Sequence, residues 1–182
     1  MNEVARAKAF DVDEVLVKAM ELFWKHGYER TSLTDLVLHT GVHKRSMYDT
    51  FGDKHTLYLK VLERYSEIID QSSERIVHNA RSTKESLKLL LEMAFQREFE
   101  SPKGCLLVNT AVELAEHDPQ SKLLINQCWS CSEELMCEVI ESGQRSGEIS
   151  QTLDALSLAQ YFYNAFTGKL KEIINTTLSI LN

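Results

Sequence analysis

The chain has 182 residues, of which 43% are hydrophobic, 26% are charged and two are proline. This balance is typical of an ordinary globular protein and excludes a disordered or collagen-like chain. Its longest charge-free stretch, residues 155–168, is interrupted by polar residues and is shorter than the ~17–25 apolar residues of a membrane helix. Residues 1–10 lack the apolar core of a signal peptide, so we expect a cytoplasmic protein with no membrane partner.

The net charge of −7 is distributed unevenly along the chain. Residues 1–60 hold nine basic and nine acidic residues, whereas residues 61–182 hold 11 basic and 18 acidic ones. Because the excess of acid lies in the second part, the first part can present a local basic face. The acidic composition of the whole chain therefore does not exclude a nucleic-acid partner.

Apolar residues at three- and four-residue spacing predict helices along nearly the whole sequence, and no alternating run is long enough for a strand. The first helix is expected over residues 13–26, followed by a terminating Gly27. Ser32 and Asp35 have the Ser-x-x-acid form of a helix start, which predicts a short second helix ending near residue 39.

A turn at Gly41 separates this helix from a third one, predicted over residues 44–50. Asp53 is a suitable N-cap for a long fourth helix that ends near residue 77. The second half of the chain contains longer amphipathic patterns, separated by glycine, proline and N-capping aspartates. These patterns predict helices over residues 84–100, 105–116, 119–146 and 154 to beyond 174.

Two short helices joined by a glycine-containing turn are the helix-turn-helix arrangement. Leu36, Val42 and Met47 are expected to hold the two helices together across the turn, which leaves the other side chains of the third helix facing outward. A helix of this kind fits the DNA major groove, which is about 12 Å wide. The outward side chains expected to contact DNA are His43, Lys44, Arg45, Ser46 and Tyr48.

Basic side chains on such a helix donate hydrogen bonds to guanine edges or to phosphates, and Lys44 and Arg45 can do either. Ser46 can also contact either group. Asp49 is unusual on a DNA-facing helix. It either accepts a hydrogen bond from cytosine or pairs with a neighbouring cation and never touches DNA.

The stretch from residue 13 to residue 62 resembles the TetR-type transcriptional regulators. The matching residues are Ala19, Leu22, Phe23, Gly27, Tyr28, Thr31, Ser32, Leu33, Thr34, Asp35, Leu36, Gly41, Val42, Met47, Tyr48, Phe51, Gly52, Lys54 and Leu57. This resemblance implies an all-α protein with a three-helix DNA-binding domain over residues 1–60 and its motif at 32–51. It also implies a helical domain over residues 61–182 that binds a small-molecule effector and forms a homodimer. The most direct expectation is a repressor that its effector releases from DNA.

The resemblance also assigns roles to individual residues. Tyr48 matches a tyrosine that reaches a phosphate, and Lys54 lies at the start of the fourth helix, where the helix dipole also favours phosphate. Thr31, Ser32 and Thr34 lie at the start of the second helix, and the two threonines are placed to bond phosphates. The sequence departs from the family pattern at Val37, Thr40, His43, Asp49 and Thr50. These departures are compatible with the fold, but they mean that the resemblance does not extend to a particular operator sequence.

Lys103-Gly104-Cys105-Leu106 resembles one branch of the same family, in which a Gly-Cys-Leu segment opens the sixth helix. A helix N-terminus and a nearby lysine favour the thiolate form of cysteine, so Cys105 is a candidate sensor of electrophiles or oxidants. The other interpretation is a small buried apolar residue. The alternative function is a helical redox- or electrophile-sensing module that acts through Cys105 without binding DNA.

Apart from Cys105, the sequence contains few residue patterns that indicate a metal site or catalysis. Cys128 and Cys131 lie inside one predicted helix without a second pair, so we expect no metal site there. The sequence lacks His-Glu-x-x-His, Gly-x-Ser-x-Gly, Glu-x-x-His and glycine-rich phosphate motifs, so we expect neither an enzyme nor a cofactor.

The second domain is expected to hold the effector and the dimer contact. An apolar or aromatic effector is expected among the middle helices, and the candidate lining residues are Tyr65, Phe95, Phe99, Cys105, Trp129 and Tyr161. The last two helices carry a broad apolar stripe that is expected to form a four-helix dimer bundle and in part to cover the domain's own core. The stripe comprises Leu124, Leu135, Val139, Ile140, Leu156, Ala159, Phe162, Tyr163, Phe166, Leu170, Ile173 and Ile174.

Overall fold

The computed structural model describes the backbone of residues 10–100 and 104–163, and the side chains of these residues except 95–100. The described residues form helices, turns and connecting segments without a strand, in agreement with the all-α class expected from the sequence. The chain divides into two compact units, Met1–Tyr65 and Ser66–Asn182. The division lies inside one helix, α4 (Lys54–Asn79), a few residues after the expected junction at residues 60 and 61.

Local capping fixes the helix ends of the first unit. The Asp11 carboxylate accepts the backbone N–H of Asp13 at 2.8 Å, and Gly27 ends the first helix at a φ of 83°, in the region that favours glycine. Ser32 and Asp35 form a reciprocal capping box, as their spacing predicts. The helices before α4 are α1 (Val12–His26), α2 (Leu33–Thr40) and α3 (Lys44–Phe51).

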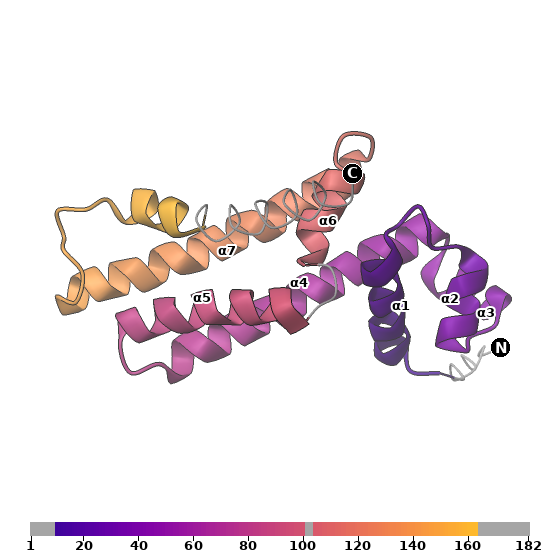
Figure 1. Cartoon of the computed structure of the whole chain (residues 1–182), viewed down its shortest axis with the longest axis horizontal. Helices are drawn as coiled ribbons and strands as arrows, with labels where there is room; N and C mark the ends of the chain where they lie inside the picture. Colours follow the sequence, from indigo (N-terminus) through magenta and orange to yellow (C-terminus); the bar gives the residue numbers. More distant parts are fainter. Residues whose placement is uncertain (1–9, 101–103, 164–182) are drawn as a thin grey trace, which may run out of the picture. The chain divides into compact units, whose positions relative to one another are not determined.

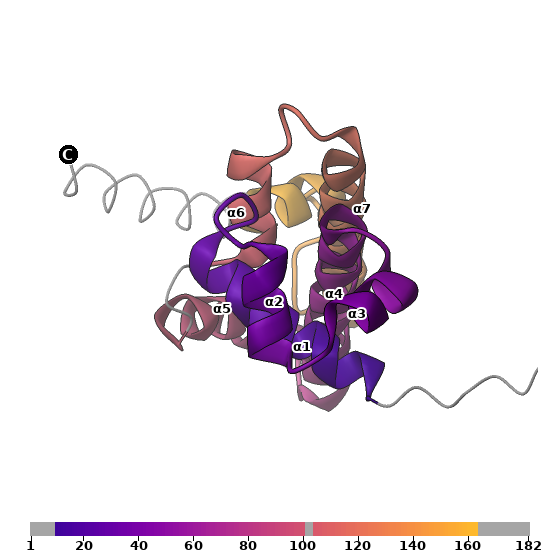
Figure 2. The same cartoon turned by 90° about the vertical axis from the view of Figure 1, so that its right-hand side faces the viewer.

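The helix-turn-helix pair is formed by α2 and α3, which lie side by side around a tight turn (Figure 2). Gly41 makes this turn in the left-handed conformation, with a φ of 74°. Leu36, Val42 and Met47, predicted to hold the pair together, are all buried. The core of the first unit consists of Val15, Leu16, Ala19, Met20, Phe23, Leu36, Val42, Met47, Phe51, Leu57, Tyr58, Val61, Leu62 and Tyr65.

The second unit contains the end of α4, three further named helices and a helix over residues 155–163 (Figure 1). The named helices are α5 (Thr83–Glu100), α6 (Leu106–Glu113) and α7 (Pro119–Ser146). Asp118 caps α7 with Pro119 in its first turn, and Gly147 ends it at a φ of 81°. Asp154 caps the helix over 155–163 by accepting the Ser157 N–H at 2.8 Å. These caps agree with the sequence prediction.

Leu87, Met136, Val139, Ile140 and Ala159 form a buried cluster that joins α5, α7 and the helix over 155–163. Phe162 and Tyr163 pack against this cluster. Several members of the predicted apolar stripe therefore cover the unit's own core. Among the described residues of that stripe, Leu156 is exposed. Phe166, Leu170, Ile173 and Ile174 lie outside the described residues.

Helix α6 is shorter than the sequence predicted, because it ends at Glu113 rather than near residue 116. The reason lies at Leu114, whose side chain is buried. Its carbonyl accepts the N–H of His117 at 2.9 Å and of Asp118 at 2.8 Å, which turns the chain toward α7. This stop needs no glycine or proline, so the sequence carries no local signal for it.

Candidate nucleic-acid interface

The outer surface of α3 carries the side chains that the sequence assigned to DNA. His43, Lys44, Arg45 and Tyr48 are exposed, and Ser46 is half-buried. His43 occupies the N-cap position of α3, but its side chain forms no capping hydrogen bond. Because Met47 and Phe51 anchor the inner face of the helix, this set of polar and basic groups is held outward.

Two contacts run along the exposed face of α3. Arg45 Nε lies 3.8 Å from a carboxylate oxygen of Asp49, and Lys44 Nζ lies 6.0 Å from the centre of the Tyr48 ring. Of the two roles left open for Asp49, the structure therefore shows the ion pair with a neighbouring cation. An exposed pair of this kind is worth little, about 0–1 kcal/mol, so Arg45 stays available to DNA.

The start of α2 contains one clear departure from the predicted interface. The Thr31 side chain is 1% exposed, and its hydroxyl donates to the Gly27 carbonyl at 2.6 Å. A buried hydroxyl with an internal acceptor cannot reach a phosphate, so the prediction for this residue is wrong. Ser32 is exposed but uses its hydroxyl in the capping box, whereas Thr34 is exposed.

The start of α4 holds the last predicted phosphate contact. The Asp53 carboxylate accepts the Thr56 N–H at 2.7 Å, and this hydrogen bonding lowers the pKa of Asp53. Lys54 is half-buried, and its Nζ lies 4.1 Å from the centre of the Tyr28 ring. Tyr28 matches the family pattern, but the sequence alone indicates no role for it. No local spacing could have linked it to Lys54, because the two residues are far apart in the sequence.

The predicted effector residues do not gather in one place. Tyr65 belongs to the first unit, where it is buried with its ring 5.1 Å from that of Trp24. It is therefore a core residue there, which corrects the prediction. Tyr161 is 69% exposed, which makes it a surface residue of this chain. Trp129 is half-buried, and the side chains of Phe95 and Phe99 lie outside the described residues.

The four cysteines occupy different environments, and none of the four forms a disulfide. Cys105 is the half-buried N-cap residue of α6, and its side chain makes no capping hydrogen bond there. Cys128 is buried, whereas Cys131 is exposed, so this pair does not share one environment. Burial raises the pKa of the Cys128 and Cys137 thiols, which keeps them protonated. Lys103 lies outside the described residues.

Polar groups also occupy the inner faces of α4 and α7 in the second unit. Ser66 donates a hydrogen bond to the Asp70 carboxylate at 3.3 Å, and Ser132 donates to the Cys128 carbonyl at 3.0 Å. Burial raises the pKa of Asp70 and is also the largest cause that raises the pKa of Tyr163. The aromatic interior expected for this unit is therefore polar in part.

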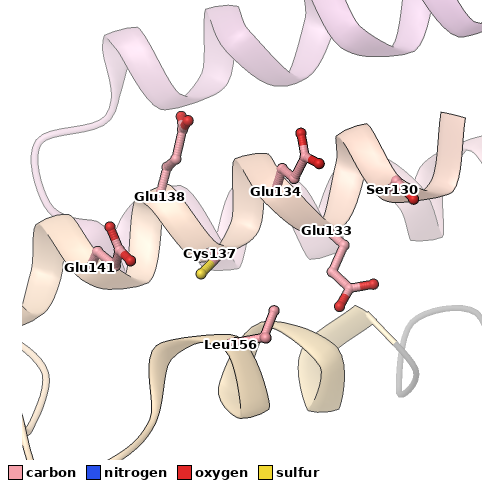
Figure 3. Close-up of a pocket in the computed structure, with 7 residues that line it drawn as sticks. All are labelled: Ser130, Glu133, Glu134, Cys137, Glu138, Glu141 and Leu156. Atoms are coloured by element: carbon pink, nitrogen blue, oxygen red, sulfur yellow. The ribbon is translucent and has the colours of Figure 1, made fainter. Parts of the chain in front are cut away.

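An open groove of about 470 Å³ lies between α7 and the helix over residues 155–163 (Figure 3). It is lined by Ser130, Glu133, Glu134, Cys137, Glu138, Glu141 and Leu156. Carboxylates dominate this surface, which suits neither DNA nor any other polyanion. In the described part of the chain, no three His, Cys, Asp or Glu side chains are arranged to hold a metal ion. The basic face that DNA requires is found on α3.

Comparison with known proteins identifies the family. Residues 15–61 match the family model of bacterial regulatory proteins of the tetR family, and residues 83–173 match the tetracyclin repressor-like C-terminal domain. None of the described helices is long and apolar enough to cross a membrane. The chain belongs to the TetR family of helix-turn-helix, DNA-binding transcriptional regulators, a family of regulators rather than of enzymes.

Individual relatives agree with this assignment. The chain is 28% identical to the uncharacterized regulator YezE of Bacillus subtilis, over 98% of this chain and 100% of that protein. It is 30% identical to the repressor ComR of Escherichia coli, over 96% of this chain and 90% of that protein. A solved structure of the regulator CifR, a cysteine mutant bound to 26-base-pair operator DNA, matches with a TM-score of 0.77 and 26% identity. That match covers 92% of this chain and 88% of CifR.

These findings give no support to the alternative function, a sensing module that acts through Cys105 without DNA. Both halves of the chain match parts of DNA-binding regulators, and the first half contains the motif with its basic helix exposed.

Proposed function

We propose that the protein is a homodimeric repressor whose two α3 helices read an operator and which leaves the DNA when a small molecule binds the Ser66–Asn182 unit. The observation that carries this proposal is the exposed basic face of α3 on a fully packed helix-turn-helix core. The name of ComR, a repressor, and the operator DNA bound to CifR support it. The cytoplasm, where bacterial DNA lies, is the compartment that this function requires.

The DNA-facing residues divide between two tasks. Lys54, Thr34 and Tyr48 contact phosphates, which supply most of the affinity and fix the position of the protein on the duplex. Arg45 and Lys44 reach base edges and supply sequence preference, with His43 and Ser46 beside them. Ser32 acts indirectly because its capping hydrogen bonds hold the start of α2.

A dimer is required because two recognition helices must meet half-sites about one helical turn apart. In this proposal the contact involves the exposed apolar side chains of the helix over 155–163, Leu156 and Tyr161. Apolar side chains that are exposed in one protomer can be buried against the same surface of the other protomer. Each unit then has a separate role, with DNA bound by the first and self-association by the second.

The effector site belongs to the second unit in this proposal and includes the half-buried Trp129 and Cys105. Effector binding favours a dimer whose α3 helices are wrongly spaced for the operator, which requires only that the effector binds that state more tightly. Cys105→Ser distinguishes the two interpretations of this thiol. If Cys105 is a sensor, the variant no longer releases DNA when electrophiles are added. If Cys105 is simply buried, release is unchanged.

The proposal is tested by a salt titration of DNA binding, using duplexes from the region that flanks the protein's own gene and a randomised duplex library. We expect two protomers per duplex and a log–log salt slope that is steep, as phosphate contacts demand. Arg45→Ala should cost about 1–3 kcal/mol on the operator and relax its sequence preference. Lys84→Ala removes the same charge from an exposed site on α5 and serves as the matched control. A folded dimer that selects no duplex from the library contradicts the proposal.

A further inference from the structure

The Tyr28 ring is fixed inside an aromatic cluster of the first unit. Its centre lies 4.8 Å from the ring centre of Tyr58 and 6.2 Å from those of Phe23 and His55. Phe23 and Tyr58 are each 1% exposed and contact one another edge to face at 4.7 Å. Packed neighbours on several sides restrict the orientation of the Tyr28 ring.

Lys54, the first residue of α4, places its ammonium over this ring at 4.1 Å from the ring centre. The electron-rich face of an aromatic ring attracts a cation at this distance. A second lysine–tyrosine contact among the described residues of the unit, Lys44 with Tyr48, is longer at 6.0 Å and joins two exposed residues. Within the described part of the chain no carboxylate forms an ion pair with Lys54, so the ring is the group that holds its ammonium.

An ammonium group has three N–H donors, and contact with one ring face cannot occupy all of them. A free lysine side chain loses much rotamer freedom when it is fixed against a phosphate. If the ring has already restricted the side chain, less freedom is lost on binding. The fixed position is at the N-terminus of α4, where the helix dipole also favours an anion.

We propose that Tyr28 is a positioning residue for DNA binding, which holds the Lys54 ammonium ready for a phosphate of the duplex. The inference rests on the phosphate role of Lys54 in the proposed function. Tyr28 itself touches no DNA in this scheme, and its contribution passes entirely through Lys54. The effects of Tyr28 and Lys54 on DNA affinity should therefore be coupled, although the two residues lie far apart in the sequence.

The test is a double-mutant cycle measured as operator affinity. Tyr28→Leu keeps an apolar side chain but removes the ring, and Tyr28→Phe keeps the ring, so the two variants form a matched pair. Each is made in the natural chain and in the Lys54→Met background. We expect Tyr28→Leu to weaken binding about twofold to fivefold, the factor that corresponds to part of the rotamer freedom of one lysine side chain. Tyr28→Phe should bind like the natural protein. In the Lys54→Met background Tyr28→Leu should have no further effect.

Two results overturn the proposal in distinguishable ways. If Tyr28→Leu weakens binding by the same factor in both backgrounds, Tyr28 does not act through Lys54. The same conclusion follows if Tyr28→Leu weakens binding in neither background. If Lys54→Met leaves the affinity and the salt slope unchanged, the phosphate role in the proposed function fails first.

A second measurement uses the natural protein, so it does not depend on whether a variant folds. In the proton NMR spectrum of the natural protein, the ε-methylene protons of Lys54 should be shifted upfield by the ring current of Tyr28. The exposed Lys84 provides the unshifted reference. Ordinary shifts for Lys54 would also overturn the inference.

Discussion

Arg45 and Asp49 face each other across one turn of α3, with 3.8 Å between the Arg45 Nε and the carboxylate. Both side chains are largely exposed, at 94% and 70%. The helix proposed to read DNA thus carries an acidic group directly beside its central arginine. A carboxylate in this place repels every phosphate it approaches, whatever the base sequence.

Asp49→Ala should therefore strengthen binding to random DNA and to the operator by similar factors. We expect each dissociation constant to fall about 1.4-fold to fivefold, since an exposed charge interaction is worth about 0.2–1 kcal/mol. Fluorescence anisotropy on both duplexes at one salt concentration measures the effect, and Asp49→Asn provides a variant of matched shape. An unchanged affinity for random DNA would show that the carboxylate has no such effect.

Thr31 and Thr34 should respond in opposite ways to replacement by valine. Thr31→Val removes the buried hydroxyl that donates to the Gly27 carbonyl at 2.6 Å, and should lower the free energy of unfolding by about 1 kcal/mol. Its operator affinity should not change. Thr34→Val alters an exposed residue, and should weaken DNA binding without destabilising the fold. Urea denaturation and operator-binding measurements test both variants, and weaker operator binding by a fully folded Thr31→Val would restore its phosphate role.

Asp70 should make the second unit less stable as the pH rises. Burial raises the pKa of its carboxyl above the ordinary value of 3.8, so the folded state holds the proton more tightly than the unfolded state does. The stability that this proton provides is complete below the unfolded pKa and is lost as the pH rises through the folded pKa. Asp70→Asn should therefore stabilise the protein at pH 7, and the gain should shrink as the pH falls toward 4.

Asp154 provides the matched contrast to Asp70. Hydrogen bonds from Ser157 lower the pKa of Asp154, so its contribution is present at neutral pH and is lost as the pH falls through the lowered pKa. Asp154→Ala should destabilise the protein at pH 7. Thermal or urea denaturation of both variants across pH tests these opposite signs. A loss of stability in Asp70→Asn at pH 7 would contradict the assignment of burial as the dominant cause.

Leu156 should contribute to self-association rather than to the fold of one protomer, because it is half exposed while Ala159 beside it is completely buried. Leu156→Glu and Leu156→Arg should each raise the dimer dissociation constant about tenfold, since a two-fold interface loses the side chain twice. Analytical ultracentrifugation measures this change. If only the glutamate variant weakens the dimer, repulsion from Glu133 and its neighbours in the groove is the cause rather than lost apolar contact.

The sequence was most informative where structure depends on neighbours along the chain. The capping box of Ser32 and Asp35, the glycine turn at Gly41 and the Asp118 cap of α7 are contacts between residues a few positions apart. Their geometry is set by backbone hydrogen bonds that any helix end must satisfy. The end of α6 was missed because Leu114 terminates it through packing and two carbonyl contacts, without a glycine or proline.

The residues of the candidate site also divide into those whose placement follows from local sequence and those whose placement depends on packing. The exposed face of α3 could be read from the alternation of Met47 and Phe51 with polar residues, since helical periodicity fixes which side chains share a face. Thr31 could not be separated from Thr34 in this way, because both lie at one helix start and only packing buries the first. The role of Asp49 likewise remained open until its neighbour Arg45 was seen beside it.

The sequence by itself determined the helices, their caps, the helix-turn-helix pair and the family of this protein. The tertiary structure alone decided that Tyr28 lies under Lys54, that Tyr65 belongs to the first unit and that Leu156 is exposed while Ala159 is buried. The physical reason is the distance along the chain over which each kind of interaction acts. Helix formation and capping are fixed by hydrogen bonds over a few residues, whereas the partner of a side chain across the core depends on how whole helices pack.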